Sequence, residues 1–267
     1  MLNVLRQELR AGWKGSAVWA LSLAALTYLM MWLFPSIARQ HAKWDQLVGQ
    51  LPRSVLAGFG MNTLRLSDIY GYYGTQIYIL LVLFVAIYAA LLFAGILARE
   101  ESDGTIDFLI ARPITRGAIF AGKTVAALGL ALGCNVVLFL ATWASFAEFH
   151  TRPFALAPLV WLSVGLLLMS LVFGFFGLLV SIYLPRPRTL TSVTIGVALA
   201  SYLVGIASAM STKLTDLRFA SPYQFVDAAT VVRRSGIPPL HLGGLLLVCA
   251  VLAAWAFAFY RVKDIAA

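Results

Sequence analysis

The sequence predicts an all-α integral membrane protein with six transmembrane helices, an N-terminal helix parallel to the membrane, and a short cytoplasmic helix between the second and third spans. Of the 267 residues, 61% are hydrophobic and only 12% are charged, whereas a soluble domain carries about 25% charged residues. Several apolar runs reach the roughly 20 residues that a helix needs to cross a hydrocarbon layer. Because backbone groups in lipid must be hydrogen-bonded within the segment, we expect these runs to be helical.

The apolar runs follow one another without a recognisable linker or soluble domain, so we expect a single transmembrane domain over residues 1–267. The fourth run is longer than a bilayer requires. We expect it to tilt, to break near Gly174 and Gly177, or to extend beyond the membrane. The predicted spans cover residues 16–34, 76–98, 124–147, 156–184, 190–210 and 241–260.

Residues 1–14 form the predicted N-terminal helix. Leucines share one face of this segment and basic residues interrupt the rest, which is typical of a helix lying in the plane of the lipid headgroups. The same residues also fit an ordinary basic segment flanking the first span, and the sequence leaves both interpretations open. The leucines are Leu2, Leu5 and Leu9, and the basic residues are Arg6, Arg10 and Lys14.

The distribution of basic residues predicts the orientation. An even number of spans places both termini on one side of the membrane, and that side has the higher density of basic residues over its shorter loops. Because lysine and arginine concentrate in cytoplasmic loops, we expect both termini to be cytoplasmic, in the inner membrane of the cell. The basic residues on this side are Arg6, Arg10, Lys14, Arg99, Arg112, Arg116, Lys123, Arg186, Arg188, Arg261 and Lys263.

The formal net charge of +9 raises the possibility of a nucleic-acid partner. The basic residues, however, stand at the ends of apolar runs, where they fit membrane topology and anionic lipid. We therefore expect membrane lipid, and no nucleic acid, among the partners.

Residues 117–124 match the phosphate-binding pattern G-x-x-x-x-G-K-[ST] letter for letter. That pattern binds phosphate in a loop between a strand and a helix, whereas here a proline-containing helical stretch precedes it and a span follows. Ile119 and Phe120 are also bulky where the loop would have to wrap a phosphate. We expect no nucleotide site in this chain, and we interpret Lys123 as a marker of the lipid headgroup boundary.

No constellation of catalytic or metal-binding side chains emerges from the sequence. The segment DGTIDFLIAR at 103–112 is similar to a motif of membrane phosphatidyl-transferases, but its spacing is longer and the next acid after Asp107 is Glu148. Metal-assisted chemistry needs several convergent oxygens. An integral membrane enzyme acting on lipid head groups is the main alternative function, and a stand-alone channel or scaffold is another.

The predicted spans contain almost no charge in their interior, whereas ion-coupled carriers usually keep ionisable residues there. The energy for any transport is therefore expected to come from elsewhere. Small residues recur in the third and fifth spans, where they let helices approach closely. We favour packing within the chain over a subunit interface for these positions, which include Gly129, Gly133, Gly196 and Gly205.

The most densely charged segment lies between the second and third spans, at residues 99–124. Ser102 or Asp103 can cap a short helix whose first turn is acidic, and Pro113 ends it. Ile106, Leu109 and Ile110 share one apolar face. A plain connecting loop would not need such a face, so the segment predicts a rigid, charged docking site for a soluble partner.

This segment resembles the permease subunits of type-2 ABC exporters, whose pattern is Glu-Glu-x-x-x-Gly-Thr, a leucine-rich turn, Pro-[small]-[Ser/Thr]-Arg, and Gly-Lys at the start of the third span. The segments LPRSVLAGFG at 51–60 and SPYQF at 221–225 resemble further parts of that family. Asp107 departs from the glutamate that the family often has. The matching residues are Glu100, Glu101, Gly104, Thr105, Leu109, Pro113, Thr115, Arg116, Gly122 and Lys123.

The resemblance implies a permease without a catalytic site of its own. Two copies of a cytosolic ATP-binding subunit would hold ATP and magnesium, and a second permease, identical or related, would complete an exporter of lipid-like, amphipathic or drug-like cargo. No cofactor would bind to this chain, and the N-terminal helix would correspond to the membrane-parallel connecting helix of the family. The implied ATPase-docking residues are Glu100, Glu101, Asp103, Gly104, Thr105, Asp107, Leu109, Arg112, Pro113 and Arg116.

Overall fold

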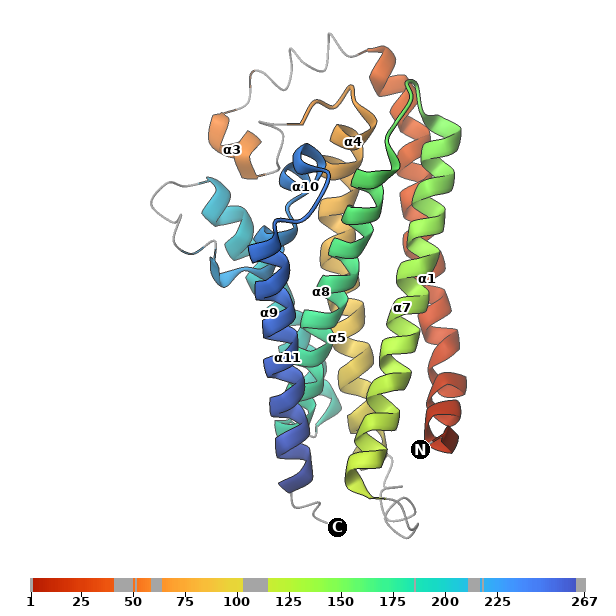
Figure 1. Cartoon of the computed structure of the whole chain (residues 1–267), viewed down its shortest axis with the longest axis vertical. Coiled ribbons are helices and arrows are strands. Elements are labelled where there is room, and N and C mark those ends of the chain that lie inside the picture. The colour runs from red at the N-terminus through yellow and green to blue at the C-terminus, as the bar shows by residue number, and fades with distance from the viewer. Residues whose placement is uncertain are drawn as a thin grey trace.

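A computed structural model describes residues 2–40, 50, 52–58, 64–102, 115–184, 186–210, 217 and 219–262. All regular elements in these ranges are helices, most of them long and upright (Figure 1). The long helices are α1 (Leu2–Arg39), α5 (Ile79–Ser102), α7 (Arg116–Phe149), α8 (Leu156–Tyr183), α9 (Pro187–Met210) and α11 (Pro239–Val262). The shorter ones are α3 (Arg53–Gly58), α4 (Ile69–Tyr72), the π-helix η1 (Tyr73–Tyr78), the 3₁₀-helix η3 (Pro222–Val226) and α10 (Ala228–Arg234).

Six helices in the described part of the chain are long and apolar enough to cross a membrane, which confirms the predicted number of spans. The fourth, fifth and sixth lie within three residues of their predicted bounds. The first three begin earlier than predicted, at Val4, Ile69 and Gly117. The spans run over Val4–Arg39, Ile69–Ala98, Gly117–Phe149, Leu156–Tyr183, Pro187–Met210 and Pro239–Arg261.

Helices α1 and α7 lie side by side and run in the same direction (Figure 1). Their contacts keep a nearly constant separation in sequence: Gly12 lies against Leu130, and the Tyr28 hydroxyl donates to the Glu148 carboxylate. One membrane face of the bundle is therefore built from two helices that are more than 100 residues apart in the chain.

Helices α5 and α8 form a second parallel pair, and they are the most buried of the six spans. Glycines in α8 let α5 approach closely: Gly174 lies against the Phe93 ring, and Gly177 lies against the carbonyl group of Ala90. The predicted break near these glycines is not present, since α8 is a continuous helix. Gly174 and Gly177 serve helix packing instead.

The prediction of a separate N-terminal helix parallel to the membrane was wrong. Residues 2–39 form one continuous helix, whose first turns run alongside the beginning of α7. The apolar face formed by Leu5 and Leu9 packs into a hydrophobic cluster of the bundle, so other helices cover it in place of lipid. The periodicity correctly indicated an apolar face, but periodicity does not reveal what covers that face.

The connection between α9 and α11 folds back onto one end of the bundle. There the Ser221 hydroxyl donates to the carbonyl oxygen of Ser201 (2.8 Å), and the Gln224 amide donates to that of Gly205 (2.8 Å). Burial raises the pKa of the Tyr223 phenol, which donates to the carbonyl oxygen of Ala198 (3.3 Å). We call this end, which also carries α4 and α10, the outer end.

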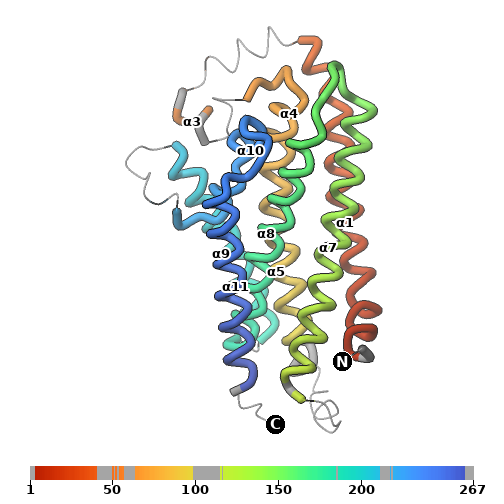
Figure 2. The backbone as a smooth tube through the Cα atoms, viewed as in Figure 1, coloured from red at the N-terminus to blue at the C-terminus, as the bar shows by residue number. Residues whose placement is uncertain are grey.

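The opposite end, the inner end, is where α1 begins, α5 ends, α7 begins and α11 ends (Figure 2). The helices α8 and α9 are also joined there. The segment with the predicted docking function thus shares an end of the molecule with the beginning of the first span and the end of the last.

Candidate functional site

The predicted docking segment joins α5 to α7 at the inner end. Glu100 and Glu101 lie in the last turns of α5, and Arg116 is the first residue of α7. The other predicted docking residues, and the short helix expected around them, lie outside the described residues: Asp103, Gly104, Thr105, Asp107, Leu109, Arg112 and Pro113.

Helix α7 begins with a side-chain cap. The Thr115 hydroxyl oxygen accepts a hydrogen bond from the Ala118 amide (3.3 Å), which satisfies one of the amides that a helix leaves unpaired at its start. Residues 117–124, which match the phosphate-binding pattern, are all helical. The amides of Gly122 and Lys123 therefore lie inside a helix rather than in the exposed loop that binds phosphate.

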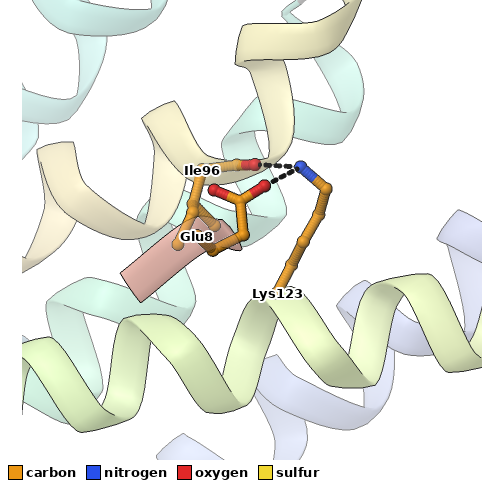
Figure 3. A network of polar contacts seen from close by, with 3 residues as sticks. All are labelled: Glu8, Ile96 and Lys123. Atoms are coloured by element: carbon orange, nitrogen blue, oxygen red, sulfur yellow. Dashed lines mark hydrogen bonds and ion pairs between the residues drawn. The ribbon is translucent and has the colours of Figure 1, made fainter. Parts of the chain in front are cut away.

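The Lys123 side chain forms a buried network with two other helices (Figure 3). Its ammonium group donates to the Glu8 carboxylate of α1 (2.9 Å) and to the carbonyl oxygen of Ile96 in α5 (2.7 Å). The side chains of Lys123 and Glu8 are only 1% and 9% exposed. An isolated charge at such a position would be strongly destabilising, so each partner makes the other tolerable.

The interpretation of Lys123 as a residue at the lipid headgroups was wrong, because its ammonium group is buried between helices. Sequence reasoning also missed Glu8. A signal was present: Glu8 is the only acidic residue before Asp45, and it shares a helical face with Gly12 and Ser16. An acid on a face that becomes buried requires a cation, but the sequence does not say which one.

Apolar side chains pack beside this network. A hydrophobic cluster at the inner end combines residues of α5, α7, α8 and α11, with leucines of α1 packed against it. Phe120 contacts the rings of Phe257 and Tyr260 in α11, with centroid separations of 5.6 and 5.2 Å. The beginning of α7 is thus fastened to α1, α5 and α11 within two turns of the docking segment.

The four glycines predicted to pack between helices lie in different environments. A Cβ atom at Gly205 would lie 2.8 Å from the Ser221 hydroxyl, and one at Gly129 would lie 3.7 Å from a Leu9 methyl group. Cβ atoms at Gly133 and Gly196 would meet nothing within 4 Å. The first two positions thus contact other parts of the chain, and the other two face outward.

The arrangement of six apolar helices around a buried core is that of a multi-pass membrane protein. In the described ranges, no group of three His, Cys, Asp or Glu side chains is placed to hold a metal ion. A family model described as ABC-2 family transporter protein matches residues 2–264. The chain therefore belongs to the ABC-2 transporter family, the membrane components of ABC transporters. No match was found among curated proteins.

Proposed function

We propose that this chain is the permease subunit of an ATP-driven exporter, with ATP hydrolysis performed by a separate cytosolic subunit that docks on residues 100–116. The family match over residues 2–264 carries this proposal. The fold supports it, since residues 100–116 connect α5 to α7 near a hydrophobic cluster that includes Ile96, Leu97 and Phe120. Force applied to this segment would act directly on α5 and α7.

The proposed complex contains two permease subunits, identical or related, and two ATP-binding subunits that hold ATP and magnesium. This chain itself holds no nucleotide and performs no catalysis. The inner end faces the cytoplasm, with the protein in the inner membrane, so that the docking segment meets the soluble ATPase. The density of basic residues on this side supports that orientation.

The proposed cargo is lipid-like, amphipathic or drug-like. The spans offer apolar outward surfaces, which include Leu21, Trp32, Leu132, Leu247 and Val251. A passage between two such subunits would suit molecules with a large apolar part. Stimulation of ATP hydrolysis by candidate amphiphiles, measured with the complex in lipid nanodiscs, would identify the class of cargo.

The docking role predicts that charge reversal at Glu100 and Glu101 releases the ATPase. The tagged chain is solubilised from its native membrane and purified, and associated ATP-binding protein is identified by mass spectrometry together with ATP hydrolysis. We expect the wild-type chain to retain the ATPase and the E100K/E101K variant to lose it while still inserting into the membrane.

The matched control is E148K, which reverses the charge of an acid at the outer end of α7. This variant should keep the ATPase, because Glu148 lies at the opposite end of the bundle from the docking segment. Retention of the ATPase by E100K/E101K would contradict the docking assignment. Absence of any ATP-binding protein from the wild-type preparation would contradict the proposed function as a whole.

A further inference from the structure

The buried ion pair at the inner end lies beside the connection between α5 and α7, and this position indicates a mechanical role in addition to any contribution to stability. We propose that Glu8, Lys123 and the carbonyl group of Ile96 form a latch, which holds the first turns of α1 to both ends of the docking segment so that all three move as one unit. The functional meaning of this latch rests on the proposed ATPase docking, whereas its mechanical role can be tested without the ATPase.

The latch lies close in sequence, on both sides, to the connection between α5 and α7 at residues 103–115, which is the central part of the proposed docking residues 100–116. Ile96 precedes the last residue of α5, Ser102, by six residues, and Lys123 follows the first residue of α7 by seven. At 1.5 Å per residue these separations are about 9 and 11 Å along the helices. One ammonium group therefore connects the helix that enters the docking segment with the helix that leaves it.

Through Glu8, the same ammonium group also connects α1 to α5 and α7. In the chain Glu8 is separated from Lys123 by 115 residues, so nothing in the covalent structure couples the beginning of α1 to the docking segment. Apolar contacts also join α1 to α7, such as that of Leu9 with Gly129. Apolar surfaces can slide past one another, whereas a buried ion pair is either formed or broken and therefore fixes the register of the helices.

The charges are not explained by a need for stability at this position. Well-packed apolar residues of similar volume often stabilise a protein as much as a buried ion pair or more. The outer end of the same two helices has an acidic contact as well, between Tyr28 and Glu148, but that contact is exposed. Among the described residues, the buried ion pair lies where the docking segment joins the bundle, which indicates a role in transmitting the movement of that segment.

The first test measures whether the latch holds α1 in place. Spin labels are attached to cysteines introduced at Arg6 and Val125, two exposed positions on α1 and α7, after replacement of the buried Cys134 and Cys249 by alanine. The full-length chain is studied in nanodiscs by double electron–electron resonance. We expect one narrow distance distribution in the otherwise unmodified chain and a broadened or shifted one in the E8Q/K123M variant, which removes both charges together.

Two comparisons make this measurement specific. E148Q, which removes an acid from the outer end of the same helix pair, should leave the Arg6–Val125 distribution narrow. Labels at Leu29 and Leu140, exposed toward the outer end, should report the same distance in E8Q/K123M as in the unmodified chain, which shows that the variant is folded. An Arg6–Val125 distribution in E8Q/K123M that is as narrow as in the unmodified chain, at the same distance, would overturn the latch.

The second test adds the ATPase purified with the chain. With the latch intact, we expect the Arg6–Val125 distance to stay the same when ATP binds. In E8Q/K123M we expect the ATPase to remain bound, the distance to become nucleotide-dependent, and the stimulation of ATP hydrolysis by the permease to be lost. A variant with unchanged distances and unchanged stimulation would overturn the proposal. If no ATPase binds to the wild-type chain, the proposed function fails, and the measurement without ATPase still decides whether the latch exists.

Discussion

The outer and inner ends of the bundle are held together by different interactions. At the outer end, aromatic rings pack on one another: Phe146 contacts both Tyr70 (5.2 Å between centroids) and Tyr73 (5.3 Å). The folded-back segment of η3 and α10 adds hydrogen bonds to backbone carbonyl groups. At the inner end, a smaller apolar cluster surrounds one ion pair. The outer end therefore depends on many aromatic and hydrogen-bonding contacts, whereas the inner end combines its apolar cluster with one buried ion pair.

The largest expected effect is that of the K123M variant, which breaks the inner-end contact from one side. The Glu8 carboxylate would remain buried without a cation, and removal of one partner from a buried ion pair costs about 3–5 kcal/mol. We expect a large decrease in the thermal unfolding midpoint of the purified chain in detergent, together with a lower yield in the membrane.

The E8Q/K123M variant is the matched comparison, since it leaves no unpaired charge. It should recover most of the stability that K123M loses, because neutral side chains of similar size are tolerated at such sites. Equal unfolding midpoints for K123M and the wild-type chain would show that the inner end does not depend on the ion pair, and the contrast between the two ends would disappear.

A smaller effect is expected from G165A, which tests the close packing of the outer end. A Cβ atom at this position would clash with the Tyr78 hydroxyl and would lie 3.3 Å from the side chain of Val226. Overpacking a filled core costs about 1–3 kcal/mol, so the unfolding midpoint should fall clearly but less than in K123M.

The control for this substitution is G133A, where an added Cβ meets nothing within 4 Å. Alanine is a better helix former than glycine by about 1 kcal/mol, so G133A should be neutral or stabilising in the isolated chain. Equal midpoints for G165A and G133A would contradict the tight packing at the outer end. A G133A variant that is stable but fails to assemble with a second permease would instead place Gly133 in the subunit interface.

The six spans could be predicted from the sequence because hydrophobicity and length alone set them. The beginnings of the first three could not, and in α7 the extension back to Arg116 depends on the Thr115 cap and on packing of Phe120 against α11. The hydropathy of the sequence likewise did not predict the π-helix η1. It lies where Gly74 contacts Ala228, a residue more than 150 positions away, so tertiary packing accompanies this departure from α-helical geometry.

The candidate site likewise has one part that could be predicted from the sequence and one part that could not. The predicted docking segment is visible in the sequence because its charges are clustered and contrast with the apolar runs on either side. The ion pair beside it is not visible, because the isolated acid Glu8 indicates that a cation is needed but not that Lys123 supplies it. Only the parallel arrangement of α1 and α7 brings them together, and that arrangement comes from the packing of the whole bundle.

The smallest effect is expected from E148Q, which directly compares the outer end of the α1–α7 pair with the inner end. Glu148 accepts a hydrogen bond from Tyr28 at the outer end of the helices that Glu8 and Lys123 join at the inner end. This contact lies on the surface of the bundle, and exposed charge contacts contribute little to stability. The midpoint of E148Q should equal that of the wild-type chain within error, whereas E8Q should be destabilised because it leaves the Lys123 ammonium group buried without its carboxylate. If the unfolding midpoint falls as much in E148Q as in E8Q, both ends of the α1–α7 pair depend on charged contacts. The ion pair at the inner end would then not differ from the contact at the outer end.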